Sequence, residues 1–195
     1  MVLILVILGI IASIVMPQIL VNDPAKEGQV TLGKKMAEYL TQASTEILLY
    51  DASLDDFTRL KDKDGYFSVA DANIVSRMSK LYQKYLKDVD IKVEIDKEYF
   101  SKTLVDYNGT DTGLQLNNEY SDFIYANDGM ILGFKFYGSC DVSEMNSIPP
   151  GFRERYEIKE ICGSVFYDTN AFKKPNKLGS DQFIIPIGKR GIKYE

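Results

Sequence analysis

The sequence contains no histidine, no tryptophan and only two cysteines in 195 residues. The absence of histidine removes the commonest general base and zinc ligand, and two cysteines cannot complete a four-ligand structural zinc site. No Gly-x-Ser-x-Gly motif and no phosphate-binding loop occur either. We therefore predict that the protein is not an enzyme. Carboxylate-based glycoside hydrolysis stays open as an alternative, because that chemistry needs only two acidic side chains.

Charged side chains are also absent from the first 22 residues, and the first ionisable side chain is that of Asp23. About 20 apolar residues can cross a bilayer as a helix, because each residue adds about 1.5 Å. A helix is the state in which one isolated segment satisfies its own backbone in lipid. The sequence thus predicts a membrane-spanning segment over residues 1–22 and a soluble domain over 23–195. A cleaved secretory signal is the alternative, although neither a basic n-region nor a clear Ala-x-Ala site is present.

The composition of the remaining chain is that of a folded domain. Charged residues make up 26% and hydrophobic residues 45% of the sequence, which is typical of globular proteins. The net charge of −5 argues against a general nucleic-acid binder. With the domain placed outside the cytoplasm, we predict a disulfide between Cys140 and Cys162. Two buried free thiols are the alternative.

A long helix is expected at the start of this domain. Asp23-Pro24 offers an N-cap followed by proline at the first helical position. Apolar residues then recur at spacings of three and four up to about Tyr50, which places them on one helix face. These residues are Val30, Leu32, Met36, Tyr39, Leu40, Ala43, Ile47 and Leu48. We expect residues 23–50 to pack this stripe against the rest of the domain.

The middle of the chain, residues 51–119, is predicted to be a variable region of mixed structure. A helix is expected from about Val69 to Lys87, and alternating apolar and charged residues from Ile91 to Ile95 predict a half-buried strand. Residues 120–195 are predicted to form an antiparallel sheet with the disulfide. Asn127-Asp128-Gly129 between two apolar runs predicts a hairpin.

The last two apolar runs complete the predicted sheet. Residues 161–167 are predicted as a central strand, and residues 183–187 as a final strand that Pro186 places at an edge. Helices followed by an antiparallel sheet define the α+β class.

Two loops carry oxygen side chains that calcium prefers. Asp62, Asp64, Gly65 and Asp71 have the outline of a calcium-binding loop, although Leu60 stands where the first ligand is needed. A plain loop before a helix is the alternative. The second group lies near the C-terminus and consists of Asp168, Asn170, Asn176 and Asp181. Asp and Asn also build turns by bonding to their own backbone, so calcium is a candidate ligand and no other cofactor is expected.

The apolar segment resembles the N-terminal helix of type IV pilins and type II secretion pseudopilins. The resemblance rests on Leu8-Gly9-Ile10-Ile11-Ala12 and on the proline at position 17. In that family the helix follows a basic leader, a cleavage site after glycine, a methylated phenylalanine and a glutamate. Aligned on these residues, the glutamate would stand immediately before Met1. The resemblance therefore implies an internally assigned start or a trimmed N-terminus.

The C-terminal segment carries a second resemblance to pilin-like proteins. Phe166-Tyr167-Asp168-Thr169-Asn170, Lys174-Pro175-Asn176, Asp181 and Phe183 follow Cys162. They are similar to the Asp-Val-Asn-Gly, Gly-Pro-Asn and Gly-x-Asp-x-Phe pattern of that family, with Ala171 and Lys174 in place of two usual glycines. Some similar pseudopilins hold calcium in this loop.

The resemblance implies a pilin-like fold, in which a long N-terminal helix packs on an antiparallel sheet. It also implies a structural subunit of a type IV pilus or a type II secretion filament. Such a subunit waits as a single-pass protein of the bacterial inner membrane, with its domain in the periplasm or outside the cell. Its partners are related pilins and the assembly machinery. The filament or membrane helix would use Val2, Leu5, Ile7, Leu8, Gly9, Ala12, Ser13 and Pro17, with the small residues allowing close helix approach.

Two alternatives to a pilus or secretion subunit stay open. A signal-anchored extracytoplasmic enzyme or binding domain would have the same anchor. A DNA-uptake minor pilin would use the basic C-terminal residues to contact phosphates, namely Lys173, Lys174, Lys177, Lys189, Arg190 and Lys193. Little aromatic interleaving accompanies them, so a solvated face, or a face that pairs with acidic neighbouring subunits, is expected in preference to a nucleic-acid partner.

Overall fold

The computed structural model describes most of the chain after the apolar segment. The described residues are 24–53, 56–86, 91–92, 102–126, 130–140, 160–170, 173 and 175–192. The predicted membrane or filament segment therefore lies outside them, as do the turn 127–129 and most of the strand predicted from Ile91 to Ile95. Within the described part, no helix is both long and apolar enough to span a bilayer.

The long helix of the domain, α2, runs from Pro24 to Tyr50, as the sequence predicted. Its buried residues are Gly33, Met36, Ala37, Leu40, Ala43, Ser44 and Ile47, which recur every three or four positions and form one stripe. Leu32 was expected in this stripe, but its side chain is 43% exposed. The reason is that Leu32 lies at the edge of the stripe, because each residue turns the helix by about 100°.

A five-stranded antiparallel sheet lies beneath α2. Its strand order is β3-β6-β7-β8-β9. The bounds are β3 Ile91–Lys92, β6 Ser121–Ala126, β7 Ile131–Phe136, β8 Ile161–Asp168 and β9 Gln182–Gly188. The predicted central strand is the interior strand β8, buried along its whole length. The predicted final strand is the edge strand β9, where Pro186 lies opposite Ser164.

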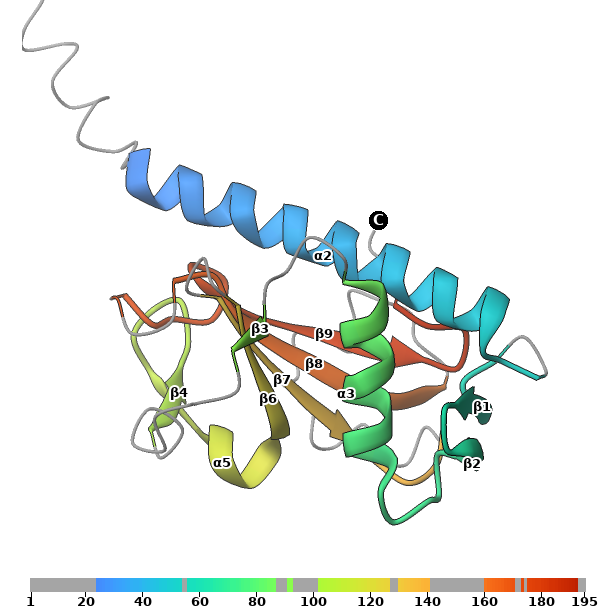
Figure 1. Ribbon diagram of the computed structural model, residues 1–195. Coiled ribbons are helices and arrows are strands. Elements are labelled where there is room, and N and C mark those ends of the chain that lie inside the picture. The colour runs from blue at the N-terminus through green and yellow to red at the C-terminus, as the bar shows by residue number, and fades with distance from the viewer. Residues whose placement is uncertain are drawn as a thin grey trace, which may run out of the picture.

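Different elements cover the two faces of this sheet (Figure 1). On one face, α2 and the helix α3 (Ile74–Tyr85) bury the larger apolar core against β6 to β9. Ser44 of α2 and Tyr82 of α3 share a buried hydrogen bond of 2.7 Å between their hydroxyl oxygens. The other face is covered by a hairpin of β4 (Thr103–Val105) and β5 (Asp111–Gln115) and by the short helix α5 (Leu116–Glu119). A second apolar cluster lies there, including Leu104, Leu116, Phe166 and Ile184.

The middle region differs from expectation in detail. The hairpins β4–β5 and β1–β2 (Arg59–Asp62 and Gly65–Ser68) were not predicted as strands. Helix α3 begins at Ile74, and not at Val69, because a turn precedes it. In that turn the Asp71 carboxylate accepts a hydrogen bond from the Asn73 backbone N–H at 2.9 Å. The α+β class is confirmed.

Candidate functional site

At Gly33, helix α2 lies directly against the sheet. The Phe183 ring of β9 lies where a side chain on Gly33 would begin, because an added Cβ would approach the ring to 2.7 Å. The same ring stacks on Tyr167 of β8 with a centroid distance of 5.1 Å. Before Gly33, none of the helix residues from 28 to 32 is buried. The helix is therefore held to the sheet at Gly33, and the residues before it are exposed or half-buried.

The predicted disulfide is present between Cys140 and Cys162. Cys162 is fully buried in β8, and Cys140 follows β7 and packs against the same apolar core. The backbone N–H of Tyr137 also donates to the Cys162 oxygen at 2.9 Å. The disulfide therefore ties both ends of the connection between β7 and β8 to the sheet.

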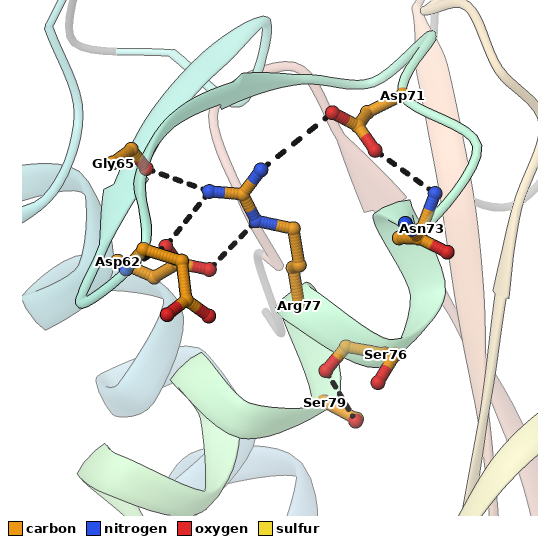
Figure 2. A network of polar contacts seen from close by, with 8 residues as sticks. Asp62, Gly65, Asp71, Asn73, Ser76, Arg77 and Ser79 are labelled. Atoms are coloured by element: carbon orange, nitrogen blue, oxygen red, sulfur yellow. Dashed lines mark hydrogen bonds and ion pairs between the residues drawn. The ribbon is translucent and has the colours of Figure 1, made fainter.

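The loop from Asp62 to Asp71, which was weighed as a calcium site against a plain loop, contains a cation from the chain itself, the guanidinium of Arg77 in α3 (Figure 2). Its Nε and Nη2 donate to the two Asp62 carboxylate oxygens at 2.7 and 2.8 Å. Nη2 also donates to the Gly65 backbone oxygen at 2.7 Å, and Nη1 lies 3.6 Å from the Asp71 carboxylate. The guanidinium also lies over the aromatic ring of Phe67, whose centroid is 4.2 Å from the guanidinium carbon.

This arrangement has a direct electrostatic effect on Asp62. The hydrogen bonds from Arg77 hold the pKa of the Asp62 carboxyl below its usual range, because they favour its charged form. Two of the carboxylates that suggested a metal site, those of Asp62 and Asp71, are thus directed at Arg77, as is the Gly65 backbone oxygen. The sequence analysis missed Arg77, because the helix was predicted to begin at Val69, whereas the structure begins it at Ile74 and places Arg77 in its first turn. The hairpin β1–β2 is thereby fastened to α3.

The second calcium candidate, between β8 and β9, is dominated by buried carboxylates that bond within the chain. The Asp181 carboxylate accepts the backbone N–H groups of Asn176 and Lys177, both at 2.8 Å. The Asp168 carboxylate accepts the Asn170 N–H at 2.9 Å and the Gln182 side-chain amide at 3.0 Å. Both aspartates are fully buried.

These contacts match the turn-building alternative, because Asp and Asn often order loops in this way. Within the described residues, no three His, Cys, Asp or Glu side chains are grouped for a metal ion. Asn170 differs from the others, since its buried carboxamide atoms have no hydrogen-bond partner in the described part of the chain.

Among the basic C-terminal residues, Lys189 has acidic partners. The Lys189 ammonium lies 3.9 Å from an Asp56 carboxylate oxygen and 4.0 Å from one of Glu160. Its backbone oxygen accepts the Phe57 N–H at 2.8 Å, so this residue joins the end of the sheet to the segment after α2. Lys174 and Lys193 lie outside the described residues.

The C-terminal end of α2 presents apolar side chains that the helical pattern did not single out. Leu49 is 69% and Tyr50 is 72% exposed. Tyr50 stacks on Tyr85 of α3 with centroids 6.5 Å apart, and the Tyr85 hydroxyl donates to Asp51 at 2.6 Å. Burial and this contact raise the pKa of Tyr85.

No family model, no curated protein and no solved structure matches this chain.

Proposed function

We propose that this protein is a structural subunit, a pilin or pseudopilin, of a type IV pilus or a type II secretion filament. One observation carries the proposal: a charge-free apolar segment is followed by α2, a 27-residue helix whose buried stripe packs on an antiparallel sheet. In a pilin-like subunit, the apolar segment enters the filament core and the sheet domain faces outward. The described helix supports this arrangement because its first turns extend beyond the sheet (Figure 1).

The packing of α2 supports a fixed orientation between the helix and the domain in the proposed filament. The helix must transmit its orientation to the domain if a filament is to have a regular surface. Its buried stripe runs from Gly33 to Ile47, so about four helical turns are fixed to the core. The Cys140–Cys162 disulfide is of the kind that persists in an oxidising compartment, which agrees with a domain outside the cytoplasm.

Filament assembly can be tested with variants at Gly9 in cells that contain the assembly machinery. Gly9→Arg places a charge in the apolar segment, which costs about 2.5–3.5 kcal/mol at the centre of a membrane helix. Gly9→Leu keeps the segment apolar but blocks close helix approach. Gly28→Ala is the control, because the space around Gly28 is open. We expect sheared filaments with the wild type and Gly28→Ala, and none with either Gly9 variant.

Membrane extraction separates the two Gly9 variants. Gly9→Leu should stay in the membrane fraction while filaments are lost. If both Gly9 variants assemble as well as the wild type, the apolar segment is not the filament core. Mass spectrometry of the mature N-terminus gives an independent reading, because prepilin processing would leave a methylated residue.

A further inference from the structure

The β4–β5 hairpin ends in an exposed turn that the proposed function does not use. Within this turn, the Gly109 N–H donates to the Asp106 backbone oxygen at 3.0 Å. The Thr110 N–H donates to the Asp106 carboxylate at 2.7 Å, and the Asp106 N–H donates to the Thr110 oxygen at 2.8 Å. Gly109 has φ +90°, a conformation that glycine adopts without steric cost. The backbone of the turn is therefore fixed by its own hydrogen bonds.

The side chains at the tip of this turn remain available. Asn108, Gly109 and Thr110 are all exposed. Neither the Asn108 carboxamide nor the Thr110 hydroxyl bonds to any residue in the part of the chain that the structure describes. The base of the hairpin is held to the C-terminal loop, because the Leu178 N–H donates to the Val105 oxygen at 2.8 Å. The tip is thus a fixed, accessible projection.

Asn108-Gly109-Thr110 is an Asn-x-Thr acceptor sequence for N-glycosylation. Among the asparagines of the chain, Asn108 alone has Ser or Thr two positions later. We propose that Asn108 carries an N-linked glycan. In the transfer, the Asn108 side-chain nitrogen forms a bond to C1 of a sugar on a lipid pyrophosphate donor. The C1–oxygen bond breaks, the electron pair leaves with the pyrophosphate, and a base of the transferase takes the nitrogen-bound proton.

The geometry suits this modification for two reasons. A transferase must reach the asparagine and the threonine together, and both are exposed on one tight turn. A preformed turn also reduces the ordering cost of binding. The hairpin covers the sheet face opposite α2 (Figure 1), so a glycan there leaves the helix face free. The inference depends on the extracytoplasmic placement proposed above, and not on filament assembly.

The test uses the full chain with an acceptor sequence, Asp-Gln-Asn-Ala-Thr, appended after Glu195. It is produced in a bacterial host that carries a periplasmic oligosaccharyltransferase and its lipid-linked oligosaccharide. Trypsin releases residues 103–135 as one peptide, since Lys102 and Lys135 flank a stretch without Lys or Arg. We expect this peptide to gain the mass of one donor oligosaccharide. The gain should be lost in Asn108→Gln and Thr110→Ala and kept in Thr110→Ser.

The appended sequence separates the two ways in which this test can fail. A modified tag with an unmodified 103–135 peptide would overturn the Asn108 site while leaving the extracytoplasmic placement intact. If neither acceptor is modified, the chain does not reach the transferase, and both the placement and the Asn108 site are overturned. Glycan on the peptide of Asn108→Gln would also refute the assignment.

Discussion

Tyr167 of β8 donates a hydrogen bond from its hydroxyl to the backbone oxygen of Gly33 in α2, with 3.0 Å between the oxygens. The bond is buried and joins residues 134 positions apart. It forms where the helix has no side chain, so the tyrosine reaches the helix backbone directly. Gly33 therefore sets the distance between the helix and the sheet.

Two glycine substitutions in α2 test this contact. Gly28→Ala should stabilise the domain by about 0.5–1 kcal/mol, because alanine favours the helix and the space is open. Gly33→Ala gains the same propensity but forces the Phe183 ring out of its stack, an overpacking cost of about 1–3 kcal/mol. Gly33→Ala should therefore be less stable than Gly28→Ala in thermal and urea unfolding. Equal stability of the two variants would show that α2 does not lie closely on Phe183.

The Arg77 network predicts a loss of stability when its cation is removed. Arg77→Gln leaves the Asp62 carboxylate, whose side chain is 7% exposed, without its bidentate partner. We expect a lower midpoint of thermal unfolding at pH 7. Lys84→Met is the matched control on the same helix, because Lys84 is half exposed and Asp51 keeps its bond from Tyr85. The decrease in the midpoint of thermal unfolding should be clearly smaller for Lys84→Met than for Arg77→Gln.

The same network predicts a pH dependence. Since Arg77 lowers the pKa of folded Asp62, the stabilisation is complete above the unfolded pKa of about 3.9. It is lost as the pH falls through the lower, folded pKa. The stability difference between wild type and Arg77→Gln should thus be largest near neutrality and shrink in acid below that value. A difference that stays constant into strong acid would contradict the proposed role of the Asp62 charge.

The disulfide predicts a defined loss on reduction. It joins cysteines 22 positions apart, for which the chain-entropy relation gives a stabilisation of about 3 kcal/mol. We expect the double variant Cys140→Ala/Cys162→Ala to lose about that amount in denaturant unfolding. Reductant should bring the wild type close to the variant and leave the variant unchanged. A wild type that is insensitive to reductant after unfolding and refolding would oppose this account.

Two glycines with similar backbone angles separate conformational strain from crowding. Gly191 and Gly179 have φ of +83° and +80°, so alanine costs about 1–2 kcal/mol at each. At Gly191 the added Cβ would also lie 2.9 Å from the Ser44 Cβ and 3.0 Å from Phe57, whereas Gly179 faces open space. Gly191→Ala should therefore cost about 1–3 kcal/mol more than Gly179→Ala, measured by denaturant unfolding. Equal costs would mean that the C-terminal segment does not pack on α2.

Asp181 allows the turn-building role to be compared with metal binding. Asp181→Asn keeps the shape but replaces one acceptor of a backbone N–H with a donor. We expect a loss of about 1–3 kcal/mol, as for other buried groups left unsatisfied. The loss should be the same in a chelator and in calcium, as read by thermal unfolding. A loss that appears only with calcium would instead establish the metal site.

The regular parts of this fold could be predicted because local pattern and final environment agree. Proline at the first helical position marked the start of α2, and a continuous apolar run marked the buried strand β8. The β4–β5 and β1–β2 hairpins were not predicted, because their strands are short and polar. Helix α3 begins later than predicted, because the Asp71 carboxylate bonds to the turn before it. The spacing of apolar residues carries no information about that hydrogen bond.

The loop around Asp62 shows why a candidate site is harder to predict than an element. Its spacing of acidic residues and glycine suggested a calcium ion, whereas the cation that the structure places there is the guanidinium of Arg77. The identity of the cation depended on Arg77, which reaches the loop only after the chain folds α3 back onto the hairpin. A tertiary contact of this kind has no signature in the spacing of the loop itself.

Pro186 has a consequence for how the sheet resists aggregation. It interrupts Phe183-Ile184-Ile185-Pro186-Ile187, a segment whose β-branched and aromatic composition would otherwise favour intermolecular cross-β stacking. In the folded domain it lies in the edge strand β9, where a missing N–H deprives an incoming strand of one donor. Pro186 thus disfavours strand-to-strand aggregation both in the unfolded chain and at the edge of the folded sheet.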